Sequence, residues 1–217
     1  ENTSMGKLAA TGDTGGAAIS GGTITIHGGT VTATGSNGGA GISGAGVTIH
    51  GGTVTATGGN GGAGISGSTT ATGNAFIIAS RIDVLDNAQS GVIIEGNVGT
   101  VYGDKVTLTT DASIPSGKTL TIESGKTLTI GEGVTLKVEE GATLMNKGAI
   151  IVYGELIGEV AGNGTIIYKV TGITIAPTTL SLDVDKTAKL QATITPDKAT
   201  DKTVTWESLS LIHISEP

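Results

Sequence analysis

Two histidines stand at equivalent places in a repeated stretch of the chain. The residues TIHGGTVTATG occur at Thr25–Gly35 and again at Thr48–Gly58, which places His27 and His50 23 residues apart. Two imidazoles brought together could share a transition-metal ion, because imidazole nitrogen is a common ligand for such ions. The one other histidine, His213, lies near the end of the chain. We therefore favour a structural role for His27 and His50, on the outer surface of a repeating fold.

A group of carboxylates follows these repeats. Its members are Asp83, Asp86, Glu95 and Asp104. Their oxygens could bind calcium, although a solvated outer face is the simpler explanation. Arg81 and Asp83 are the only arginine and carboxylate that stand close together in the sequence. No motif identifies a pair of carboxylates for glycoside hydrolysis. We expect a protein that is not an enzyme and holds no cofactor, with calcium as a candidate ion. The alternative is a β-helix polysaccharide lyase or glycoside hydrolase that acts on extracellular glycans.

The hexapeptide GAGISG satisfies the G-x-G-x-x-G pattern of dinucleotide sites at Gly39–Gly44 and at Gly62–Gly67. A nucleotide-binding fold needs a helix directly afterwards and an acidic residue about 20 positions further on. Neither follows, and the motif returns at the interval of the repeat. The glycines are therefore interpreted as corners of a repeating structure.

Composition excludes several classes of partner. The chain has 217 residues, a net charge of −7, no cysteine and 38 glycines, and there is no charged residue between Gly15 and Arg81. A negative charge disfavours binding to nucleic acid or to an anionic membrane. No segment approaches the roughly 20 apolar residues of a membrane-spanning helix, so we expect no membrane insertion. The opening residues ENTSMGKLAATG lack the features of a signal peptide, and we expect the chain to be an internal piece of a longer protein.

The elements that position the histidines repeat every 23 residues. Gly15–Asn37 and Gly38–Asn60 differ at five positions. Apolar and polar residues alternate between glycine pairs, which indicates short strands joined by tight corners. Three inward-facing pieces per repeat predict one coil of a parallel β-solenoid, with coils about 4.8 Å apart. An antiparallel array of hairpins is the alternative. The predicted inward ladders are Ile19–Ile42–Ile65, Ile26–Ile49 and Val31–Val54.

A shorter repeat begins at Ile114. Four copies of eight residues run IPSGKTLT, IESGKTLT, IGEGVTLK and VEEGATLM. One inward position holds Leu120, Leu128, Leu136 and Leu144, and the other holds Ile114, Ile122, Ile130 and Val138. One strand and one turn per copy predict that the solenoid continues through residues 68–169.

Stacked coils would place the outward threonines in rows beside the two histidines. Rows of hydroxyl groups can hydrogen-bond to sugar hydroxyls, although threonine also has a high intrinsic strand propensity. The predicted glycan contacts are Thr30, Thr32, Thr34, Thr53, Thr55, Thr57, His27 and His50. The predicted partner is therefore an extracellular or host polysaccharide.

The register changes again at Val170. The stretch VTGITIAPTTLSLDVDKTAKLQATITPDKATDKTVTWES contains Pro177, an alternating pattern and a final strand with Trp206. It resembles the start of a group 2 bacterial immunoglobulin-like domain, over residues 170–208. Asp185 stands where that family more often has glycine in a turn. The resemblance implies about half of a β-sandwich, with exposed apolar positions at Leu180, Leu182, Val184, Leu190, Ala192 and Ile194. It also implies further Ig-like modules in the full-length protein.

The last nine residues, LSLIHISEP, do not continue this pattern, and we interpret 209–217 as a non-native tail. The glycine-rich and IPSGKTLTI blocks also resemble repeat regions of secreted or wall-attached proteins of gut-type bacteria, some of which bind carbohydrate. The predicted organisation is an all-β chain with a glycine-rich solenoid over 1–67, a continuing solenoid over 68–169 and a truncated Ig-like domain over 170–208. The expected function is adhesion, glycan binding or a stalk at the bacterial cell surface, where the signal peptide and anchor lie outside this piece.

Overall fold

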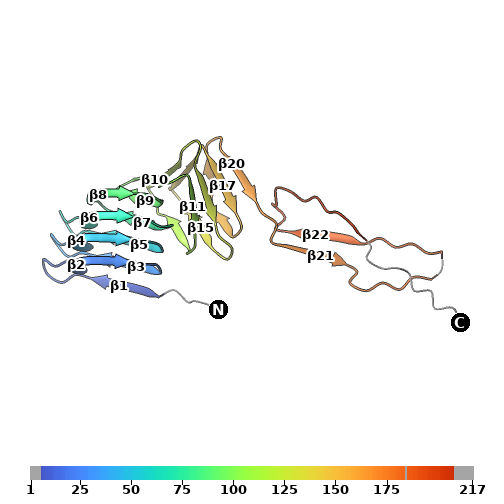
Figure 1. Ribbon diagram of the computed structural model, residues 1–217, viewed down its shortest axis with the longest axis horizontal. Coiled ribbons are helices and arrows are strands. Elements are labelled where there is room, and N and C mark those ends of the chain that lie inside the picture. The colour runs from blue at the N-terminus through green and yellow to red at the C-terminus, as the bar shows by residue number, and fades with distance from the viewer. Residues whose placement is uncertain (1–5, 184, 208–217) are drawn as a thin grey trace. The chain divides into compact units, whose positions relative to one another are not determined.

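The structure is a computed structural model that describes residues 6–183 and 185–207, and every regular element in those residues is a β-strand (Figure 1). The chain divides into two compact units, residues 1–167 and 168–217. The first unit is a parallel β-solenoid, as the sequence predicts, and it has about seven turns. The predicted tail at 209–217 lies outside the described residues.

The N-terminal coils have two sheets. One sheet begins with β1 (Lys7–Thr11), β3 (Thr30–Thr34), β5 (Thr53–Thr57), β7 (Phe76–Ala79) and β9 (Gly91–Glu95). The other contains β2 (Ile19–Ile26), β4 (Ile42–Ile49), β6 (Ile65–Ala71) and β8 (Ile82–Ala88). Neighbouring strands within these two sets are parallel. The antiparallel hairpin array is therefore wrong.

The predicted ladders are confirmed. Ile19 pairs with Ile42 and Ile42 pairs with Ile65, while Val31 pairs with Val54. Ile26 likewise pairs with Ile49. Each side chain thus stacks on the equivalent residue of the next coil, and the inward residues form a continuous aliphatic core.

The three predicted inward pieces of each coil face the core, but the first two belong to one long strand and are not separate strands. Ile42 and Val47 both lie in β4 and both are buried, although they are five residues apart. Strict alternation would place them on opposite faces of the sheet. The register of β4 against β6 shifts between Ser43 and Gly46, and such a bulge returns the following residues to the core face.

The C-terminal coils have three strands each. Their strands are β10 (Val98–Tyr102), β11 (Lys105–Leu108), β12 (Ala112–Ile114), β13 (Thr119–Ile122), β14 (Thr127–Ile130), β15 (Thr135–Val138), β16 (Thr143–Asn146), β17 (Ala149–Val152), β18 (Glu155–Ile157), β19 (Val160–Ala161) and β20 (Thr165–Tyr168). Each eight-residue copy is one side of a coil, so Leu120 stacks on Leu144 and not on Leu128. Strands β10, β13, β16 and β19 extend the first sheet to nine strands.

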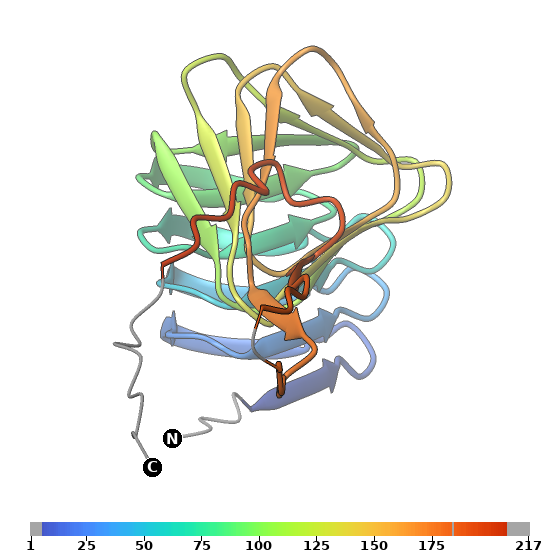
Figure 2. The same ribbon diagram turned by 90° about the vertical axis from the view of Figure 1, so that its right-hand side faces the viewer.

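The two sets of coils share this sheet but use opposite faces of it. Strand β10 pairs antiparallel to β9, with Gly99 opposite Ile94, and Gly99 also pairs with Leu120. Ile94 and Leu120 therefore face one core, while Ile93 belongs to the core of the N-terminal coils. All four residues of β7 are buried, as expected for a strand that is covered on both faces. The strand direction and the core side thus reverse together at β10, and strands β17 and β20 of the C-terminal coils run across the direction of the N-terminal strands (Figures 1 and 2).

The C-terminal unit contains one antiparallel pair, β21 (Gly172–Ala176) and β22 (Gln191–Thr195). The expected exposure holds at Leu180, Leu182 and Leu190, whereas Ala192 and Ile194 are half-buried and Val184 lies outside the described residues. The stretch that ends at Trp206 is not a strand, contrary to the prediction. Within the described residues no strand lies beside it to pair with its backbone groups, and an unpaired strand is not stable in water.

Candidate functional site

The predicted threonine rows run along the outer face of β3 and β5. Thr30, Thr32 and Thr34 pair with Thr53, Thr55 and Thr57, so the two rows stack as the sequence predicts. Thr32, Thr34 and Thr57 are exposed, whereas Thr30 and Thr55 are half-buried. Thr34 and Thr57 are the last residues of their strands and lie next to the glycine corners, whereas Thr32 lies in the middle of β3.

Thr53 differs from this prediction, because the C-terminal coils cover it. Its side chain is buried, its Oγ1 donates to the carbonyl oxygen of Asp111 at 2.8 Å, and the Oγ1 of Thr110 lies 3.0 Å away. A ligand on the outer face cannot reach this hydroxyl group. The repeat alone could not show this, because the partners lie 57 and 58 residues further along the chain.

The two histidines lie together at the short corner between the sheets. Both side chains are exposed, their ring centroids are 5.0 Å apart, and the ring planes differ by 14°. The Nδ1 atom of His50 lies 2.7 Å from the Oγ1 of Thr72 in the next coil. The predicted stacking of the imidazoles is therefore present, and a third side chain continues the column.

A groove that the sequence did not predict follows the long glycine-rich corners. Its volume is about 320 Å³, and four successive coils line it. The lining residues are Gly15, Ala17, Gly38, Gly39, Ala40, Ser43, Gly61, Gly62, Ala63, Ser66, Arg81 and Asp83. The corners come so close together that a Cβ atom on Gly62 would overlap the carbonyl oxygen of Gly39. Bare backbone and two serine side chains therefore form most of the wall.

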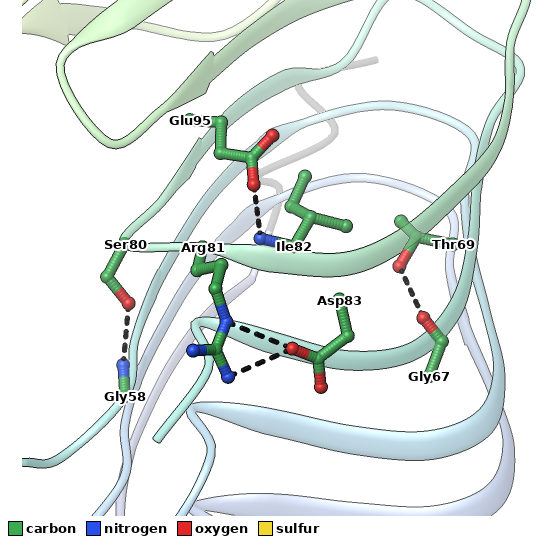
Figure 3. Close-up of polar contacts among 8 residues, drawn as sticks. All are labelled: Gly58, Gly67, Thr69, Ser80, Arg81, Ile82, Asp83 and Glu95. Atoms are coloured by element: carbon green, nitrogen blue, oxygen red, sulfur yellow. Dashed lines mark hydrogen bonds and ion pairs between the residues drawn. The ribbon is translucent and has the colours of Figure 1, made fainter. Parts of the chain in front are cut away.

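Arg81 and Asp83 form a fixed pair at one end of the groove (Figure 3). The Nε and Nη2 atoms of Arg81 each lie 3.0 Å from Oδ1 of Asp83. Around them, the backbone N–H of Gly58 donates to Ser80 Oγ at 3.0 Å, and that of Ile82 donates to Glu95 Oε1 at 2.9 Å. The pair presents guanidinium donors beside carboxylate acceptors, a combination that suits a ligand rich in hydroxyl groups.

The candidate calcium ligands do not converge. Asp83 pairs with Arg81, Asp86 accepts a hydrogen bond from Ser68, and Glu95 binds the backbone of Ile82. Across residues 6–183 and 185–207, no three His, Cys, Asp or Glu side chains gather as a metal site would require. The described carboxylates therefore do not form a shared cluster that could bind calcium.

The comparison with protein families identifies the C-terminal segment. Residues 169–210 match the bacterial Ig-like domain (group 2) family. The resemblance that the sequence suggested over 170–208 is confirmed. Asp185 has a positive φ of 64°, which explains why glycine suits this turn. Ig-like domains of this group occur in bacterial surface proteins.

The search of curated proteins and the search of solved structures each found no match to the chain. In the described part of the chain, no helix has the length and apolar character needed to span a bilayer.

Proposed function

We propose that the chain is a non-enzymatic piece of a bacterial surface protein, in which the solenoid binds glycans outside the cell and the Ig-like segment acts as a spacer. The Ig-like match supports the surface location. The solenoid supports the binding role, because a rigid stack of coils repeats the same polar groups at a regular spacing. The carboxylates of Asp83, Asp86 and Glu95 each have a separate partner, which favours binding over catalysis.

The groove at the glycine corners is the observation that carries the glycan proposal. Aromatic residues make up only 2% of the chain, so a sugar platform built from stacked rings is not available. A polar concave wall is the alternative way to hold a sugar, and the Arg81–Asp83 pair supplies its charged hydrogen-bonding groups. Thr34 and Thr57 precede the glycines that open the corners, so the threonine rows lead towards the groove.

A glycan array probed with the whole chain tests this proposal. The double variant Arg81→Gln/Asp83→Asn should weaken binding at least tenfold, because two charged contacts are lost. Lys137 and Glu139 provide a matched control, since they form a similar exposed pair, also two residues apart, at 2.8 Å. Their double replacement by glutamine should leave binding unchanged.

Two results would contradict the proposal. Binding that survives in the Arg81→Gln/Asp83→Asn variant would remove the groove as the site. The triple variant Thr32→Ala/Thr34→Ala/Thr57→Ala would then test the threonine rows. A failure to bind any glycan would remove the binding role and leave a spacer.

A further inference from the structure

His27, His50 and Thr72 form a column at the short corner of successive coils. Each residue directly follows a strand, namely β2, β4 and β6. The backbone N–H of His50 donates to the carbonyl of Ile26 at 2.8 Å, and that of Thr72 donates to Ile49 at 3.1 Å. The sheet ladder therefore continues through the column and fixes the spacing of the three side chains.

Thr72 holds the ring of His50 in a defined orientation. The 2.7 Å contact joins the threonine hydroxyl to Nδ1 of His50. With Nδ1 as the donor, the proton sits on that nitrogen and the lone pair of Nε2 is free for a ligand. A hydrogen bond to the second ring nitrogen is the usual way in which proteins orient a metal-binding histidine.

The surroundings favour nitrogen as the ligand type. No Asp, Glu, Lys or Arg occurs between Gly15 and Arg81, so these coils supply no carboxylate that would suit calcium or magnesium. Imidazole suits copper, nickel and zinc ions. Both rings are exposed, which leaves the remaining coordination positions open to water or to an external ligand.

We propose that His27 and His50 form a two-imidazole binding site for a divalent transition-metal ion, with Thr72 as a positioning residue. Metal–nitrogen bonds are about 2.0–2.1 Å long, so two ligating nitrogens must lie about 3–4 Å apart. The centroid separation of 5.0 Å allows this spacing when the exposed ring of His27 rotates about its side-chain bonds towards the fixed ring of His50. The site is separate from the groove, and it does not depend on the glycan-binding proposal.

Isothermal titration of the whole chain with nickel chloride and copper(II) chloride is the test. A His213→Gln background removes the third histidine. One ion per chain should bind, copper more tightly than nickel. His27→Gln and His50→Gln should each weaken binding at least tenfold, because a single imidazole cannot chelate. Thr72→Val should weaken it by about 10–100-fold, as is typical for the loss of an outer-shell partner.

Thr70→Val is the matched control, because Thr70 is a half-buried threonine like Thr72 and lies in β6, two residues before it. It should bind as the parent does. Nickel should also raise the melting temperature of the parent more than that of either single-histidine variant, and this readout reports on the folded protein. The proposal is overturned if either histidine variant keeps the parental affinity. The role of Thr72 is overturned if Thr72→Val behaves like Thr70→Val.

Discussion

Replacing Thr53 by valine tests how much the contact of the C-terminal coils with the outer face of β5 contributes to the stability of the solenoid. Valine keeps the shape and the strand propensity of threonine but removes the hydroxyl group. The carbonyl of Asp111 and the hydroxyl of Thr110 would then lose their partner at 2.8 and 3.0 Å. Leaving such groups without a partner costs about 1–3 kcal/mol. For a unit of 167 residues, a loss of about 2 kcal/mol lowers the melting temperature by about 4–8 °C.

Thr30→Val is the internal control for this experiment. Thr30 pairs directly with Thr53 and occupies the same position of the repeat one coil earlier, where it is only half-buried. Its replacement should change the free energy of unfolding by no more than about 0.5 kcal/mol. Urea and thermal unfolding, followed by circular dichroism, measure both variants. Equal effects of the two substitutions would refute the reasoning, because only the cover by the C-terminal coils distinguishes the two sites.

Three further predictions concern packing and backbone conformation. Gly35→Ala should destabilise the solenoid by about 1–3 kcal/mol in urea unfolding, because the new methyl group would overlap the backbone carbonyls of Gly39 and Ala40 in the same corner. Gly46→Ala, which meets open space, should stay within about 0.5 kcal/mol. Phe76→Ala should cost about 3–5 kcal/mol, since Phe76 is fully buried on the outer face of the shared sheet; a cost below 1 kcal/mol would contradict a second core there. Asp185→Gly should slow proteolysis of the C-terminal unit slightly, with a gain of at most about 1 kcal/mol, because it relieves the positive φ.

The ladders of the N-terminal coils could be predicted because the repeats are nearly identical. A translation of 23 residues brings Ile19 onto Ile42 and His27 onto His50, and no other alignment does so. The same argument predicts one strand per eight-residue copy. The number of sides in each coil could not be predicted, because a bulge at Ser43–Gly46 and the turn angles decide it.

The burial of both faces of the shared sheet is reflected in the composition of its strands, although the repeat period does not reveal it. Strands β7 and β9 are apolar at nearly every position, whereas β3 alternates. An apolar run indicates burial on both faces, but it does not show what covers the second face.

The groove at the glycine corners could not be predicted from the repeat either. The last N-terminal coil shortens, so that Ile65 pairs with Ile82 only 17 residues later, and this brings Arg81 beside the glycine corners.

The stacking of coils also restricts which charges the repeats can carry. In the N-terminal coils each residue stacks on the equivalent residue of the next coil. A charged residue in the 23-residue unit would therefore face a like charge about 4.8 Å away. Even in water that repulsion is about 0.9 kcal/mol for each pair, and every added coil would repeat it. The stretch between Gly15 and Arg81 contains no such residue. In the C-terminal coils three copies complete one turn, so Glu123 lies over Lys147, at 3.2 Å, and not over another glutamate. A repeat that forms a whole coil must therefore avoid charged residues, because each would stack on an identical charge. A repeat that forms one third of a coil can carry them, because its charges stack on a different residue.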